Sequence, residues 1–160
     1  MTNILARDHS KCHGCRQCEV ACGMTSEYRT GSSRPRVRAI TWDLEGWGVA
    51  IGCLHCEDAP CMSVCPKEAI FVDAELSRVM VDYDQCIGCR TCVAACPFGA
   101  MEFDAELKRV VKCDLCDGDP VCAKLCAYEA IRYVDREEEC AVKTMEVARK
   151  LRALLAGSDP

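Results

Sequence analysis

Cysteine thiols are the side chains of this sequence whose number and spacing could do chemistry. The 160 residues include 17 cysteines, and sixteen of them fall into four groups that each begin with two cysteines separated by two residues. Thiolates are strong ligands for zinc and for iron–sulfur clusters, so each group predicts a metal centre. The groups, numbered motifs one to four, are Cys12, Cys15, Cys18 and Cys22; Cys53, Cys56, Cys61 and Cys65; Cys86, Cys89, Cys92 and Cys96; and Cys113, Cys116, Cys122 and Cys126.

The spacing within the motifs favours iron–sulfur clusters over zinc. Motifs one and three read C-x2-C-x2-C-x3-C, and motifs two and four lengthen only the interval before the third cysteine. In bacterial two-cluster ferredoxins such a run binds [4Fe-4S] clusters, and its fourth thiolate ligates the other cluster. A zinc site would instead join two separated C-x2-C knuckles, and an odd number of cysteines cannot pair completely into disulfides. The motifs therefore predict four [4Fe-4S] clusters, with Cys140 left over as a spare thiol.

The composition argues against several other classes of protein. The first ten residues lack the basic and apolar regions of a secretory signal, and no run of 18 apolar residues could span a membrane. The net charge of -5 disfavours nucleic acid and anionic membranes as partners. The sequence also lacks a G-x-G-x-x-G nucleotide loop and a plausible pairing of nucleophile and base. We therefore expect a cytoplasmic, non-catalytic protein with no membrane span and no nucleic-acid partner.

The four motifs are related in alternating pairs. Gly14 and Arg16 of motif one correspond to Gly88 and Arg90 of motif three, and the tripeptide Glu-Ala-Ile follows the fourth cysteine of motifs two and four. This order indicates that a unit of two motifs was duplicated.

Short strands must position the cysteine loops. Three segments, residues 36–51, 69–81 and 100–111, each contain two apolar runs around a polar or glycine-containing turn, which predicts a β-hairpin. Short strands and single-turn helices between cluster loops predict an α+β fold with little conventional core. Folding and metal binding are then expected to be coupled.

The C-terminal segment differs from the rest of the chain. Residues 136–155 contain no Gly or Pro and are acidic at the start and basic at the end, which predicts a helix. Met145, Ala148, Leu151 and Leu155 fall on one face of this helix. That face either folds back over the chain's own domain or packs on a neighbouring subunit or second copy, and head-to-tail copies would build a filament.

Residues 10–135 resemble a known family in the order and detail of their motifs. Motif two contains Cys53-Leu-His-Cys56 and a proline before Cys61, and motif four begins Lys112-Cys-Asp-Leu-Cys116. In these features the chain resembles the four-cluster electron-transfer subunits of the dimethyl sulfoxide reductase iron–sulfur family. It is most similar to the small polyferredoxin subunits of tungsten aldehyde oxidoreductases.

The resemblance implies crossed ligation, in which each motif gives three thiolates to one cluster and the fourth to another. Motif one is thereby paired with motif four, and motif two with motif three. The implied ligand sets are Cys12, Cys15, Cys18 and Cys126; Cys113, Cys116, Cys122 and Cys22; Cys53, Cys56, Cys61 and Cys96; and Cys86, Cys89, Cys92 and Cys65. Two pseudo-symmetric dicluster ferredoxin lobes are therefore expected. The outer lobe comprises residues 1–48 with 98–135 and the inner lobe residues 49–97, and residues 136–160 form a helical tail.

The resemblance also implies the function and the partners. Substrate oxidation is expected on a subunit with a tungsten or molybdenum cofactor, and the clusters would pass electrons to a flavin-containing subunit or a ferredoxin. A role in a formate dehydrogenase or hydrogenase complex, a free-standing polyferredoxin shuttle and a cluster-carrying maturation factor are the alternatives.

Three further features have two interpretations or depart from the family pattern. His55 could donate a hydrogen bond to a cluster sulfur or serve in packing, and Trp42 and Trp47 could anchor a partner or shield a cluster from water. Proline follows the fourth cysteine in motifs two and three, but Gly23 and Ala127 stand at these positions in motifs one and four. The lobe that contains both irregular motifs is therefore expected to differ in solvent access and reduction potential.

Overall fold

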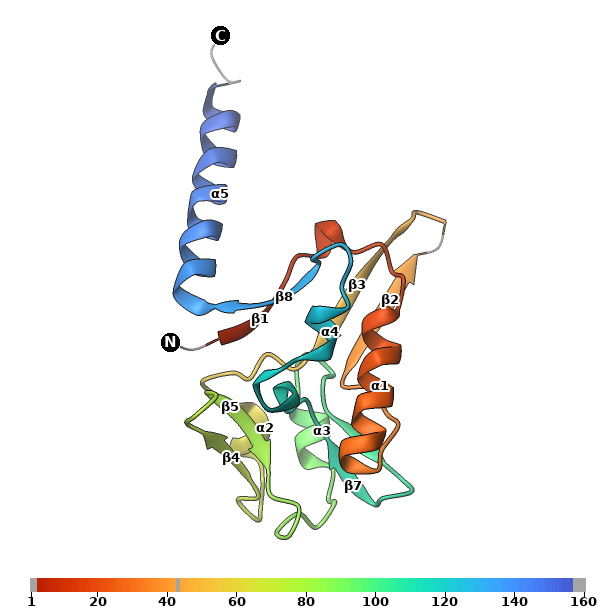
Figure 1. Ribbon diagram of the computed structural model, residues 1–160. Helices are drawn as coiled ribbons and strands as arrows, with labels where there is room; N and C mark the ends of the chain where they lie inside the picture. The colour runs from red at the N-terminus through yellow and green to blue at the C-terminus, as the bar shows by residue number, and fades with distance from the viewer. Residues whose placement is uncertain (1–2, 43, 157–160) are drawn as a thin grey trace.

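The computed structural model describes residues 3–42 and 44–156. Within these ranges the chain forms four antiparallel two-stranded sheets linked by short helices and ends in a long helix (Figure 1). The strands are β1 (Asn3–Arg7), β2 (Val37–Trp42), β3 (Trp47–Gly52), β4 (Ile70–Asp73), β5 (Arg78–Val81), β6 (Glu102–Asp104), β7 (Arg109–Val111) and β8 (Ile131–Asp135). The helices are η1 (His9–Lys11), α1 (Gln17–Thr30), α2 (Pro60–Ser63), α3 (Thr91–Ala95), η2 (Leu115–Gly118), α4 (Val121–Lys124) and α5 (Arg136–Ala156), where η denotes a 3-10 helix. This content is the α+β class that the sequence predicts.

Three of the sheets are the predicted hairpins. Strands β2 and β3 pair from Val37 opposite Gly52 to Trp42 opposite Trp47, and β4–β5 and β6–β7 form shorter hairpins. The last two share the turn sequence Asp-Ala-Glu-Leu. In both, the carboxylate of the aspartate, Asp73 or Asp104, accepts a backbone N–H two residues later at 3.0 Å. These side chains close the turn locally, which explains why the hairpins are readable from the sequence.

The fourth sheet joins the two ends of the chain. Strand β1 pairs with β8 over five residues, from Asn3 opposite Asp135 to Arg7 opposite Ile131. The sequence analysis did not predict this pairing, because no local turn connects the two strands. The sheet places the segment before motif one beside the segment after motif four.

The buried residues form two separate clusters. One combines Cys18 and Cys22 of motif one with Cys122 of motif four, together with apolar residues of β2, β3 and β8. The other combines motifs two and three with residues of β4, β5 and β7. Its members are Ala59, Ile70, Val79, Val81, Cys92, Met101 and Val110, with Cys61, Met62, Cys65, Cys86, Val93, Cys96 and Phe103 packed against them. Hairpin β6–β7, which the sequence analysis assigned to the outer lobe, thus contributes apolar side chains to the core around motifs two and three.

Helix α5 confirms the predicted C-terminal helix. It extends away from the body of the molecule rather than folding back over it (Figure 1). At its base, Glu139 is buried and accepts hydrogen bonds from the guanidinium of Arg132 on β8 at 2.9 and 3.0 Å. Farther along, Met145, Leu151 and Leu154 are each more than half exposed. The helix therefore presents an apolar surface to the solvent.

Candidate metal centres

The four C-x2-C loops share one backbone conformation. In each, the residue just before the second cysteine has a positive φ: 69° at Gly14, 49° at His55, 67° at Gly88 and 55° at Leu115. A left-handed residue at this point reverses the chain within the loop, so that two closely spaced thiols can approach the same centre. The two glycines are readable from the sequence. His55 and Leu115 adopt the same strained region without that signal, because the surrounding fold imposes it.

In motifs one and three the third cysteine is the second residue of a helix. Arg16 and Arg90 have φ values of 61° and 67° and immediately precede α1 and α3. Cys18 and Cys92 then lie in the first turn of these helices and are buried. The predicted relation between motifs one and three is thus also present in the backbone.

Each of these two loops rests against a hairpin. A Cβ atom added at Gly14 would lie 2.5 Å from Thr41 Cγ2, and the Gly48 N–H donates to the Cys12 carbonyl at 2.9 Å. A Cβ atom added at Gly88 would lie 2.9 Å from the Lys108 carbonyl oxygen. The glycines are therefore needed for close approach as well as for their conformation.

A hollow in the structure brings together one of the implied crossed ligand sets. Cys53, Cys56 and Cys61 of motif two line it, and the fourth cysteine on its wall is Cys96 of motif three. Burial raises the pKa of the Cys61 thiol, and its neighbours Cys53 and Cys96 add to the rise. The His55 N–H donates to Cys53 Sγ and the Ala100 N–H to Cys96 Sγ, each at 3.4 Å. Such donors stabilise a thiolate, so the residues fit a [4Fe-4S] cluster with one thiolate at each iron.

Thiols of motifs one and four also interact across the chain. Burial raises the pKa of Cys18 to about 11, with further contributions from Cys15, Cys12 and Cys126. This neighbourhood contains the four residues of the first implied set. A group of thiols with raised pKa values is unfavourable as free thiolates and requires a bound cation to ionise together.

The second implied ligand set, three thiols of motif four with Cys22 of motif one, also contains a thiol with a raised pKa. Burial raises the pKa of Cys122 to about 12, and Cys22, Cys116 and Cys18 add to the rise. The Arg36 N–H donates to Cys22 Sγ at 3.1 Å. Cys22, the last cysteine of motif one, therefore lies among the thiols of motif four.

Three thiols of motif three, Cys86, Cys92 and Cys96, lie in or against the second buried cluster, whereas Cys89 is exposed. Burial raises the pKa of Cys92 to about 11, with contributions from Cys89, Cys61 and Cys86. Cys65, the implied fourth ligand, packs against the same cluster as Cys86 and Cys92. In the described ranges, no three His, Cys, Asp or Glu side chains converge on a position for a single metal ion. Cys140 lies exposed on α5.

His55 lies half-buried at the wall of the hollow around motif two. Its Nδ1 accepts the Val79 N–H at 3.1 Å, so the proton of the neutral ring is assigned to Nε2. Burial and, to a smaller extent, the nearby charges of Lys112, Arg7 and Arg78 together lower the pKa of His55 to about 3. Among the described residues, the buried Nε2 has no hydrogen-bond partner. An unused donor beside four thiols fits an acceptor such as a cluster sulfide, as the first interpretation of His55 expects.

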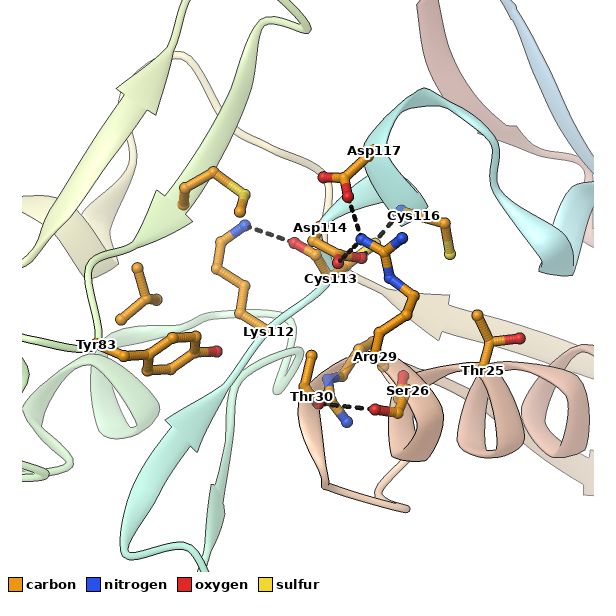
Figure 2. A pocket seen from close by; sticks show the side chains of 13 residues that line it. Thr25, Ser26, Arg29, Thr30, Tyr83, Lys112, Cys113, Asp114, Cys116 and Asp117 are labelled. Carbon is orange, nitrogen blue, oxygen red and sulfur yellow. Dashed lines mark hydrogen bonds and ion pairs between the residues drawn. The ribbon is translucent and has the colours of Figure 1, made fainter.

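The sequence analysis did not single out the charged residues around motif four for a function. Arg29 on α1 forms ion pairs with Asp117 and, at 3.0 Å, with Asp114 (Figure 2). Arg78 on β5 also pairs with Asp117. These contacts join residues 39 to 88 positions apart in the chain. No local pattern identifies such partners.

A family model described as a 4Fe-4S dicluster domain matches residues 48–136, more than half of the chain. The chain belongs to the 4Fe-4S dicluster domain family. With the cysteine count, this membership confirms the predicted four [4Fe-4S] clusters.

Several curated relatives are similar to this chain over most of its length. The chain is 33% identical over 153 residues to the polyferredoxin-like subunit of an aliphatic sulfonate oxidoreductase of Pyrococcus furiosus, covering 88% of each chain. It is 36% identical to the electron transport protein HydN of Escherichia coli, covering 86% of this chain and 91% of the relative. It is 34% identical to the thiosulfate reductase electron transfer subunit PhsB of Salmonella typhi, covering 81% and 74%. The residues with described structure include no helix that is both long and apolar enough to cross a membrane.

Proposed function

We propose that this chain is a non-catalytic electron-transfer subunit whose four [4Fe-4S] clusters relay electrons between the catalytic subunit of an oxidoreductase and a second carrier. The observation that carries the proposal is the hollow lined by three thiols of motif two and by Cys96 of motif three. Crossed ligation holds two clusters side by side, because each motif contributes to both. Short separation between clusters is what electron transfer along the chain requires.

The ligand sets of the proposal follow the crossed scheme. Three sets are supported by the thiol neighbourhoods around Cys61, Cys18 and Cys122. The fourth is supported by the packing of Cys65, Cys86 and Cys92 in one buried cluster. The proposed sets are Cys12, Cys15, Cys18 and Cys126; Cys113, Cys116, Cys122 and Cys22; Cys53, Cys56, Cys61 and Cys96; and Cys86, Cys89, Cys92 and Cys65.

The proposed donor is a subunit with a tungsten or molybdenum cofactor, an aldehyde oxidoreductase in the first instance, and the acceptor a flavin-containing subunit or a ferredoxin. The similarity to named electron-transfer subunits of a sulfonate oxidoreductase and a thiosulfate reductase supports a role within such a complex. A formate dehydrogenase is the second candidate, because the iron–sulfur subunit of that enzyme from Wolinella succinogenes is 38% identical over 84 residues. We place the complex in the cytoplasm.

Helix α5 is the proposed contact with the partner or with a further copy of the chain. Its apolar residues Met145, Leu151 and Leu154 are exposed on the longest of the described helices, and the shorter α1 also exposes Val20, Met24 and Tyr28. Head-to-tail contacts through this helix would extend the relay into a filament.

Anoxic affinity purification of the tagged full chain tests this function. We expect iron and acid-labile sulfide in the chain, and a tungsten or molybdenum oxidoreductase in the eluate. The variant Leu151→Asp should reduce recovery of the partner, whereas Arg149→Asp, about 200° away around the helix, should reduce it less. A fully metallated chain that elutes alone would instead support a free shuttle. A colourless, folded chain without sulfide would contradict the function altogether.

A further inference from the structure

Lys112 is a buried lysine at the meeting point of three segments. The residue is 6% exposed and stands in the sequence directly between the end of β7 and Cys113. Its ammonium donates to the Val79 carbonyl on β5, to His55 Nδ1 at 3.2 Å and to the Cys113 carbonyl at 3.3 Å. Figure 2 shows the side chain pointing toward the Cys113 carbonyl. A lysine is rarely buried to this degree unless its charge is compensated or used.

The side chain lies between two of the proposed cluster sites. Lys112 lines the hollow formed by motif two and Cys96, and it also lines a second cavity whose wall includes Cys113 and Cys116, two of the four proposed ligands of the motif-four cluster. These two sites belong to different pairs of motifs. Cys53 and Cys113 are also electrostatic neighbours across this boundary, since Cys53 adds to the burial-driven rise in the pKa of Cys113. Lys112 therefore lies at the boundary between the two paired sets of motifs, motifs one and four on one side and motifs two and three on the other.

The hydrogen bonds of Lys112 place its charge near both sites and hold it there. Its three partners are two carbonyls and an uncharged imidazole, so no carboxylate among them neutralises the ammonium. Arg7 approaches the same boundary from β1 and donates to the Cys53 carbonyl at 3.2 Å. The boundary is therefore cationic, although the whole chain is acidic.

We propose that Lys112 is a positioning residue that fixes the junction between the two halves of the relay and raises the reduction potentials of the two clusters beside it. The proposal rests on the cluster ligation proposed above. Reduction adds one electron to a cluster that is already anionic with its thiolates. A cation held nearby stabilises the reduced form more than the oxidised form, and in the interior this effect is only weakly screened. Electrons are thereby drawn to the junction from both sides.

The test compares three variants by anoxic redox titration followed by electron paramagnetic resonance. Lys112→Met removes the charge and keeps the length, Lys112→Arg keeps the charge, and Lys150→Met removes an exposed charge from α5 as a matched control. In Lys112→Met, we expect the equilibrium constant for reduction to fall about tenfold at two of the four clusters, or about 59 mV for a one-electron couple. In the Lys112→Arg and Lys150→Met variants, the reduction potentials should change by less than a third of the shift expected for Lys112→Met.

Several results would overturn the proposal. These are potentials that do not change in Lys112→Met, an equal shift of all four clusters, or an equal shift in Lys112→Arg. If Lys112→Met does not retain clusters, Lys112→Gln is measured, because it keeps a donor without the charge. Loss of clusters from both neutral variants but not from Lys112→Arg would support the positioning role, and loss from all three would contradict it. A wild-type chain without clusters would instead refute the proposed function.

Discussion

Motifs one and three have the same cysteine spacing, but the chain leaves them in different ways. Helix α3 is five residues long and ends at Ala95, just before Cys96 and Pro97, whereas α1 continues through Cys22 and Gly23 to Thr30. Proline disfavours the helical region for the residue before it and cannot donate the next backbone hydrogen bond, so it ends the helix. Between motifs one and three, the residue after the fourth cysteine therefore accounts for the difference in helix length. Motif four shows that it is not sufficient, because α4 already ends at Lys124 although Ala127 follows Cys126.

The longer α1 gives motif one contacts that motif three lacks. Its last turns carry Arg29, which pairs with Asp114 and Asp117 of motif four, and Thr30, whose carbonyl accepts from Arg109 on β7. The extension thus links the chain-end motifs to the hairpin that packs with motifs two and three. The expected difference between the two lobes in solvent access and reduction potential stays a prediction.

The largest effect is expected from Gly23→Pro. The substitution places proline in the seventh position of α1 and should cost about 3 kcal/mol or more of unfolding free energy. The reverse change, Pro97→Ala, should cost less than about 1 kcal/mol. Anoxic thermal unfolding of the metallated chains measures both. Equal losses for the two variants would show that the exit residue does not distinguish the motifs.

A smaller effect is expected at the glycines of the two loops. Gly14→Ala and Gly88→Ala should each cost about 1–3 kcal/mol, because alanine must adopt a positive φ. Thr41→Ser should recover part of the loss in Gly14→Ala, since it removes the Cγ2 atom that the new Cβ meets. The obstacle at Gly88 is a backbone carbonyl, so truncation of the Lys108 side chain should not help. Iron retention and unfolding temperature measure the stability of each variant. If Thr41→Ser does not recover stability in the Gly14→Ala chain, the assigned contact between the new Cβ and Thr41 Cγ2 is contradicted.

The smallest effect is expected for Asp117→Asn. The ion pairs of Asp117 with Arg29 and Arg78 are partly exposed, so their loss should cost less than about 1 kcal/mol, and less still at high salt. Asp119→Asn is the matched control, because Asp119 pairs only with the exposed Lys124 among the ion pairs within the described ranges. Chemical unfolding at low and high ionic strength separates the two. A loss that does not depend on salt would mean that Asp117 acts through its backbone turn instead.

The sequence predicts features of this molecule that are local. The three hairpins and α5 follow from turn residues, apolar runs and charge at the helix ends, and the cysteine spacing predicts the four clusters. The pairing of β1 with β8 could not be predicted, because it joins residues at opposite ends of the chain. The positive φ of His55 and the burial of Lys112 also depend on distant packing. In the sequence nothing distinguishes Lys112 from a surface lysine. Its burial results from contacts with β5 and motif two, which are distant in the chain.

Crossed ligation is the central claim of this account, and paramagnetic resonance of single-cysteine variants tests it most directly. Anoxically prepared and reduced Cys56→Ala, Cys96→Ala and Cys89→Ala chains are compared with the wild type. If Cys96 completes the site of motif two, Cys96→Ala and Cys56→Ala will lose or alter the same cluster signal, and Cys89→Ala will affect a different one. If Cys96→Ala instead reproduces the spectrum of Cys89→Ala, each motif holds its own cluster and the account is contradicted.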